Sequence, residues 1–202
     1  MKKFCNSLLP ILCLCPVLFI FVCKSPSGGG STASNDICDY IRNMTKSGTA
    51  KVTGEINSDT ITAIKSALSD LRVRDNSILV ALDLSETTGL TSLPSMSTCY
   101  NLSEIYIPDS VNVIEEEAFD SCVQIKDVKI SSNVTSIGRK AFARCSNLRM
   151  IDMPDSVKTI GDECFFDCVN LYNIKRLGSI TELGRHTFYK CGWNNCNSNQ
   201  CY

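Results

Sequence analysis

The sequence predicts an α/β fold in which 23-residue repeats stack into a solenoid, with a parallel sheet along one face and a helical capping region at the N-terminus. Two observations lead to this prediction. Apolar residues recur every 23 positions between residues 102 and 193, and each repeat begins with the alternating apolar and polar residues of a strand. In addition, an amphipathic segment precedes the repeats. A chain of 202 residues is long enough for one domain of this kind.

Residues 1–22 have the pattern of a secretory signal peptide, because two lysines precede an apolar stretch. That stretch is shorter than the roughly 20 residues that a membrane-spanning helix needs. It stops at Cys23, and residues 23–34 form a tether rich in glycine and serine. This arrangement resembles the lipobox of bacterial lipoproteins, which implies that Cys23 is lipidated and becomes the new N-terminus. Val22 stands where a small residue is usual, so an ordinary cleaved signal peptide is the alternative.

Residues 35–78 do not follow the period and are expected to form an N-terminal α/β cap. We expect a short helix from Asn35 or Asp36, a strand at 51–56, and a clearer helix that begins near Ser58. Because the second helix is amphipathic and comes just before the repeats, it is expected to cover the apolar end of the stack. Its apolar face consists of Ile61, Ile64, Leu68 and Leu71.

Residues 79–193 carry the repeats, as one degenerate unit followed by four regular ones. The pattern Leu-x-x-Ile-x-Ile-Pro-Asp-Ser-Val-x-x-Ile predicts a strand that ends in a turn at Pro108. Residues 115–122 are expected to form a short helical turn. One unit cannot bury its own apolar edge, whereas stacked units can. The regular units are Leu102 to Gln124, Ile125 to Asn147, Leu148 to Asn170 and Leu171 to Trp193.

The repeat closely resembles the BspA-type, or treponemal, leucine-rich repeat, whose unit continues with Ile-Gly-x-x-Ala-Phe-x-x-Cys. Residues 101–191 match nearly throughout, although Ser131 replaces a proline and Cys164 an alanine. Arg176 stands at an apolar position, so the fourth unit is expected to open toward solvent. The resemblance implies a leucine-rich repeat solenoid in a cell-surface lipoprotein. Members of this family are associated with attachment to host extracellular-matrix proteins, host cells or other bacteria.

The thirteen cysteines separate by position. Cys196 and Cys201, in the C-terminal tail at 194–202, are candidates for a disulfide. A zinc site that combines them with His186 and Cys191 is the weaker interpretation, because the paired Cys-x-x-Cys spacing is missing. Five others recur at the repeat spacing and are expected to form a buried structural column of thiols. They are Cys99, Cys122, Cys145, Cys168 and Cys191.

Neither a catalytic constellation nor a cofactor motif is recognisable, so the sequence predicts a non-enzymatic protein with no cofactor, no metal and no small-molecule substrate. A net charge of -1 argues against binding to nucleic acid. We therefore expect an exported protein, lipid-anchored to the cell envelope at the outer membrane or cell surface, that binds proteins. A structural or assembly component of the bacterial envelope is the alternative, and a secreted enzyme or inhibitor is the least favoured one.

The candidate binding surface is the outward face of the predicted strands, whose side chains alternate with buried ones. It mixes charges with Tyr106 and Met150, two amphipathic side chains of the kind that anchor protein contacts. The alternative is an ordinary solvated sheet face. The candidate residues are Asp83, Glu104, Tyr106, Asp127, Lys129, Met150, Asp152, Asn173 and Lys175.

Overall fold

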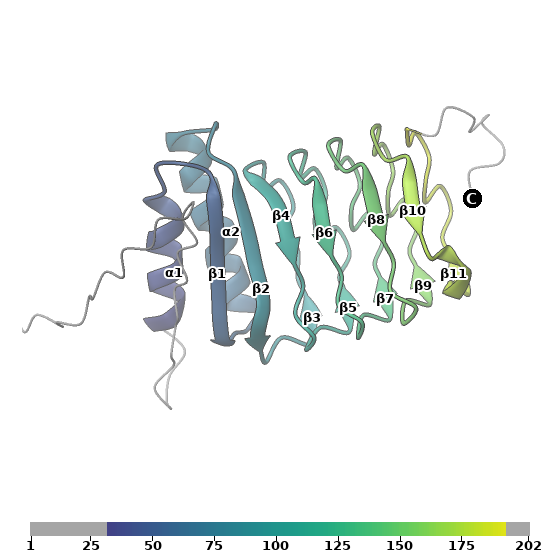
Figure 1. Ribbon diagram of the computed structural model, residues 1–202, viewed down its shortest axis with the longest axis horizontal. Coiled ribbons are helices and arrows are strands. Elements are labelled where there is room, and N and C mark those ends of the chain that lie inside the picture. Colours follow the sequence, from purple (N-terminus) through teal and green to yellow (C-terminus); the bar gives the residue numbers. More distant parts are fainter. Residues whose placement is uncertain (1–31, 193–202) are drawn as a thin grey trace, which may run out of the picture.

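The computed structural model describes residues 32–192, which form a cap followed by a solenoid of stacked coils (Figure 1). The cap consists of α1 (Thr32–Arg42), β1 (Gly48–Glu55) and α2 (Ser58–Arg74). The 23-residue solenoid that the sequence predicts is confirmed. The signal peptide, Cys23 and the Cys196–Cys201 pair lie outside the described residues.

One strand from each coil runs along the first face of the solenoid, and neighbouring strands are parallel. Ile105 lies opposite Val128, one repeat of 23 residues further along, so each repeat makes one complete coil. The hydrogen-bonded orders are β1-β2-β4-β6 and β8-β10. These strands are β2 (Val80–Thr88), β4 (Leu102–Tyr106), β6 (Asp127–Lys129), β8 (Met150–Asp152) and β10 (Asn173–Lys175).

A second parallel ladder runs along another side of the coils, although the sequence predicts a sheet on one face only. Its strands contain two residues each, which is too short for alternation to be recognised in the sequence. The second residue of each strand from Leu93 to Ile160 is buried. The strands are β3 (Ser92–Leu93), β5 (Val113–Ile114), β7 (Ser136–Ile137), β9 (Thr159–Ile160) and β11 (Glu182–Leu183).

The short helical turn expected at residues 115–122 is wrong, because this segment forms consecutive turns. Glu117 and Ser121 have φ angles of 55° and 60°, and left-handed residues interrupt a right-handed helix. The freed backbone groups pair with the next coil instead, where the Phe119 amide donates to the Ala141 carbonyl at 2.7 Å. The same conformation recurs at Lys140, Arg144, Glu163, Asp167, His186 and Lys190.

Phenylalanine rings form a continuous stack inside the solenoid, next to the columns of aliphatic residues. The rings of Phe119, Phe142, Phe165 and Phe188 lie 5.2, 5.4 and 5.6 Å apart, centroid to centroid, and are nearly parallel. The C-terminal end of the solenoid is open to solvent. Leu183 in the last coil is 43% exposed, whereas Ile160, its equivalent one coil earlier, is 1% exposed. The last coil also contains the 3₁₀-helix η1 (Leu177–Ser179), which follows Arg176 at a φ of 61°.

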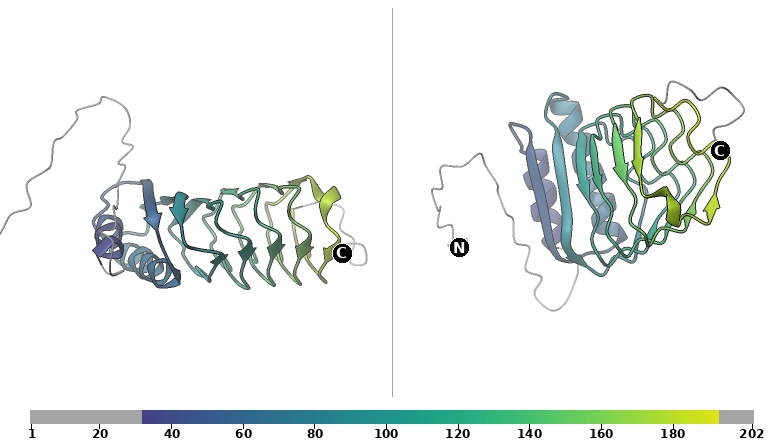
Figure 2. Two further views of the ribbon diagram at one scale, coloured as in Figure 1. Left: turned by 90° about the horizontal axis from the view of Figure 1, so that it is seen from below. Right: turned by 45° about the vertical axis from the view of Figure 1, so that its right-hand side comes forward.

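The cap extends the sheet of the solenoid by one strand, since β1 pairs in parallel with β2. Both helices lie at this end of the molecule, beside β1 and β2 (Figure 2). The Asn57 side chain accepts a hydrogen bond from the Thr60 amide at 3.0 Å, which caps α2. All four residues of the predicted apolar face of α2 are buried, together with Ala67. Within residues 32–192 no helix combines the length and apolarity needed to cross a bilayer.

Candidate functional site

The nine candidate residues of the strand face lie on β2, β4, β6, β8 and β10, and we refer to this surface as the strand face. Each alternates along its strand with inward residues such as Leu82, Ile105 and Ile151, which are buried. One row across the strands contains Lys51, Asp83, Tyr106 and Lys129 in register, followed by Asp152 and Lys175. A second row contains Glu104 and Asp127, followed by Met150 and Asn173.

Four charged side chains of the strand face take part in ion pairs, two of them with residues outside it. Lys51 Nζ lies 3.7 Å from the Asp83 carboxylate, and Lys129 Nζ lies 2.9 Å from that of Asp127. The hydrogen bond from Lys129 to Asp127 raises the pKa of Lys129. Because an exposed pair such as Lys129–Asp127 contributes little to stability, a partner that offers charges of its own can replace it at small cost.

Two less polar side chains stand among these charges. Met150 is 41% exposed, and Tyr106 is half-buried with its hydroxyl 3.3 Å from Glu104 Oε2. The strands that carry them, β4 and β8, lie on either side of β6, and the two side chains belong to different rows, so they are separated both across the strands, by about 10 Å, and along them. The strand face therefore presents apolar contact area inside a charged surround.

The five thiols predicted as a column lie at equivalent corners of the coils, and the first four are buried. In the later coils each Sγ contacts a carbonyl of the preceding coil: Cys145 contacts Phe119 at 3.2 Å and Cys168 contacts Phe142 at 3.0 Å. Burial raises the pKa of the Cys145 and Cys168 thiols and raises that of half-buried Cys191 to about 12. Protonated thiols of this kind are poor nucleophiles and poor metal ligands.

Cys99, the first thiol of the column, has a different environment. A hydrogen bond with the Cys122 thiol lowers the pKa of Cys99, and the Lys65 ammonium lowers it further, while burial opposes both. The Cys122 thiol also lies 3.2 Å from the Met96 carbonyl, to which it donates. Cys99 is thus the thiol of the described column that ionises most easily.

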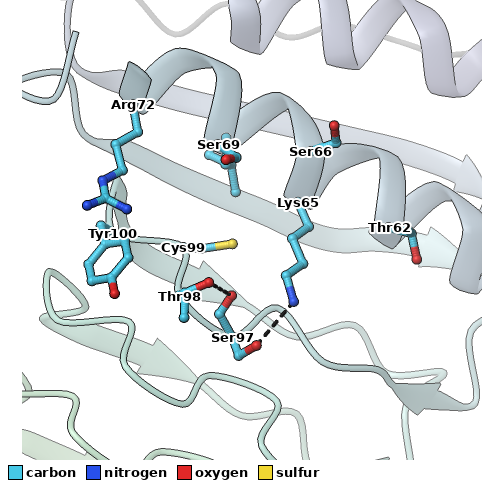
Figure 3. Close-up of a pocket in the computed structure, with 10 residues that line it drawn as sticks. Thr62, Lys65, Ser66, Ser69, Arg72, Ser97, Thr98, Cys99 and Tyr100 are labelled. Carbon is cyan, nitrogen blue, oxygen red and sulfur yellow. Dashed lines mark hydrogen bonds between the residues drawn. The ribbon is translucent and has the colours of Figure 1, made fainter. Parts of the chain in front are cut away.

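Cys99 also lines a groove of about 360 Å³ that the sequence analysis missed (Figure 3). The groove lies between α2 and the turn at residues 97–100, which are separated by some 30 positions in the chain, so no local pattern links them. The one available signal was the spacing of Lys65 and Arg72, whose separation of seven residues puts them on the same side of a helix.

Among the residues that the structure describes, no three His, Cys, Asp or Glu side chains lie close enough together to hold a metal ion. His186 is exposed and lies edge-on to the Tyr189 ring, with centroids 5.7 Å apart. The tail cysteines with which His186 was considered lie outside the described part of the chain.

Comparisons with known proteins agree with the repeat architecture. Residues 93–200 match the family described as BspA type leucine rich repeat region, in six copies. A leucine rich repeat protein from T. pallidum has a similar structure, with 28% identity, a TM-score of 0.53, and coverage of 56% of this chain and 55% of that one. A comparison with curated proteins finds no match.

A second similar structure is that of a leucine rich cell surface protein from Faecalibacterium prausnitzii A2-165. It has 30% identity and a TM-score of 0.50, and the match covers 52% of this chain and 28% of that one. The present chain therefore spans about half of the first solved relative and less than a third of the second.

Proposed function

The chain belongs to the BspA-type leucine-rich repeat family, and we propose that it is a non-enzymatic cell-surface lipoprotein that binds other proteins through its strand face. The strand face carries the proposal, because it combines an exposed Met150 and a half-buried Tyr106 with paired charges on a rigid sheet. Stacked repeats present continuous surfaces of this kind to their partners. One solved relative is itself described as a cell surface protein.

The size of the strand face sets the expected strength of binding. Five strands spaced about 4.8 Å apart make a surface about 20 Å wide between the first and the last strand. A surface this small is expected to form an interface at the low end of the usual range, with a modest affinity for a single contact. Many copies on one membrane would raise the effective affinity, which suits attachment to host extracellular-matrix or cell-surface proteins.

The double variant Tyr106→Asp/Met150→Asp tests this proposal. Immobilised extracellular-matrix protein is the probe, and surface plasmon resonance measures its binding to a soluble form of the chain without residues 1–23. We expect the double variant to bind at least tenfold more weakly, because it places two unpaired carboxylates where apolar contact is needed. The matched control is Val113→Asp/Val169→Asp, which adds the same charge at two exposed valines outside the strand face.

The control separates a local effect from a general one. Both double variants must keep the circular-dichroism spectrum and the melting transition of the unmodified protein. Equal binding by both variants would exclude the strand face as the contact surface. The alternative, a structural component of the envelope, is favoured if both variants bind the matrix protein as the unmodified protein does and the protein self-associates in analytical ultracentrifugation. The open last coil supports that alternative, since its strands β10 and β11 each have one strand neighbour among the described residues.

We also propose the organisation around the solenoid: a signal peptide at 1–22, a lipidated Cys23 with its tether, a cap to residue 78, repeats to 193 and a tail at 194–202. Several acyl chains on one cysteine bind a membrane firmly, because each buried methylene contributes about 0.8 kcal/mol. Cys23→Ser is expected to release the protein from the membrane fraction and abolish palmitate labelling, whereas Cys15→Ser is not. A labelled, membrane-bound Cys23→Ser protein would place the anchor elsewhere.

A further inference from the structure

The groove beside α2 is formed by two segments that approach from different parts of the fold. Thr62, Lys65, Ser69 and Arg72 follow one another along one side of α2, and the turn that leads into β4 faces them (Figure 3). Its volume of about 360 Å³ lies within the range of sites that hold small ligands. Apolar contact in the groove comes from Leu68, Cys99 and the Tyr100 ring, so the lining combines polar and apolar surface.

Two cations and no carboxylate line this groove. Neither Lys65 nor Arg72 forms an ion pair within the described residues. Lys65 Nζ donates to Ser97 Oγ at 3.1 Å, which holds it toward the groove. Seven residues of helix separate the two cations by about 10 Å along α2.

Arg72 is held in a defined orientation without using its hydrogen-bond donors. Its guanidinium carbon lies 3.8 Å from the centroid of the Tyr100 ring, so the planar group stacks on the aromatic face. Within the described residues no carbonyl or side chain accepts a hydrogen bond from Arg72. The edge of the guanidinium thus remains available for the two parallel hydrogen bonds that a carboxylate or sulfate accepts.

Hydroxyl groups line the space between the two cations. Ser69 and Thr98 are exposed, and Thr62 lies at the Lys65 end (Figure 3). The Thr62 hydroxyl donates to the Ser58 carbonyl at 3.0 Å and the Thr98 hydroxyl to the Ser97 carbonyl at 2.6 Å, so both retain acceptor lone pairs for the hydroxyls of a sugar. The Ser69 hydroxyl can both donate and accept. A peptide that binds by adding a strand would instead need a free sheet edge, and no strand contributes to this lining.

From this combination we propose that the groove binds an acidic saccharide, that is, a sugar bearing a carboxylate or a sulfate. Arg72 receives the acidic group through its free edge, the hydroxyls of Ser69 and Thr98 bind the sugar hydroxyls, and Lys65 binds the far end of the ligand or a second acidic group. The site is separate from the strand face, because α2 and the turn build it without any of the nine strand-face residues.

Calorimetric titration of the soluble chain tests the proposal with defined probes: a uronate-containing disaccharide, its sulfated form, a neutral disaccharide of the same size, sodium sulfate and an acidic tetrapeptide. We expect both acidic disaccharides to bind, and we expect rising salt to lower their affinity because the contacts are charged. Neutral sugar, sulfate alone and the peptide are each expected to bind at least tenfold more weakly.

Arg72→Gln is expected to lower the affinity for the acidic disaccharides at least tenfold. Arg72→Lys keeps the charge but loses the planar guanidinium, so it is expected to lower the affinity by an intermediate factor. The matched control is Arg185→Gln, which removes an exposed arginine in the last coil, far from α2. All three changes are at exposed side chains, and a melting curve checks that each variant is folded.

Four results would overturn the proposal. The first is an equal loss of saccharide affinity in Arg72→Gln and Arg185→Gln, and the second is equal affinity for the neutral and acidic disaccharides. The others are tighter binding of sulfate or peptide than of the acidic disaccharides, and no binding of either acidic disaccharide. The Tyr106→Asp/Met150→Asp variant is expected to bind the saccharide normally, so the result for the groove does not depend on that for the strand face.

Discussion

Replacing Gly161 by alanine tests how closely the coils pack. Gly161 follows β9, and its amide donates to the Ile137 carbonyl of the preceding coil at 2.8 Å. A Cβ atom added here would lie 2.5 Å from the Arg139 nitrogen and 2.8 Å from the Gly138 carbonyl carbon. Both are backbone atoms that cannot rotate away, so the two coils must move apart by several tenths of an ångström.

The cost follows from three contributions. Overpacking of a close-packed interior destabilises by about 1–3 kcal/mol. The hydrogen bond to Ile137 lengthens as the coils separate, which removes part of the roughly 1 kcal/mol that such a bond contributes. Alanine also restricts the unfolded chain, and this stabilises by about 0.4–1 kcal/mol. We therefore expect Gly161→Ala to lower the free energy of unfolding by about 1–3 kcal/mol.

Urea unfolding followed by circular dichroism measures this change. Gly48→Ala is the control, because its added Cβ would meet only the flexible end of Met44, at 3.6 Å. We expect that variant to be as stable as the unmodified protein or slightly more stable. If Gly161→Ala and Gly48→Ala unfold at the same urea concentration, close approach of the coil backbones is not what the glycine provides.

Two further predictions concern the thiol column. Cys145→Ser places a more polar hydroxyl in a fully buried site and is expected to lower the free energy of unfolding by about 1–3 kcal/mol in the same assay, so an unchanged midpoint would contradict the buried-thiol interpretation. At pH 8, iodoacetamide is expected to modify Cys99 before Cys122 and Cys168, because its lowered pKa leaves more thiolate and it lines the groove. Peptide mass spectrometry measures the order, and equal rates would show that the Cys122 hydrogen bond and Lys65 do not activate Cys99.

The sequence predicts the repeat but only part of the path within each coil. Columns such as Ile105, Val128 and Ile151 recur because each residue fills the same place in the core, so a single period defines which residues lie opposite one another. The left-handed residues at Glu117 and Ser121 were not predicted, since nothing in their side chains requires a positive φ. That conformation exists because it directs backbone amides to the next coil.

A glycine recurs after the short strands of the later coils, and both the repeat in the sequence and the packing of the coils are needed to explain it. Gly138, Gly161 and Gly184 occupy one column of the repeat, yet the first regular coil has Glu115 there. Glu115 faces the degenerate unit, and the Ser92 hydroxyl hydrogen-bonds to its carboxylate. The need for glycine therefore depends on the neighbouring coil, which the sequence of one unit does not reveal.

By itself the sequence determined the solenoid, its 23-residue coil, the buried thiol positions and the amphipathic face of α2, because each is a periodic consequence of burying apolar side chains. Only the tertiary structure decided the second ladder, the pairing of charges on the strand face, and the groove of Lys65, Arg72 and Tyr100. The second ladder joins residues from neighbouring coils, and the groove joins the cap to a coil. The ladder follows the 23-residue repeat, but its two-residue strands are too short to be recognised as strands in the sequence. The groove residues follow no common period, so only packing brings them together.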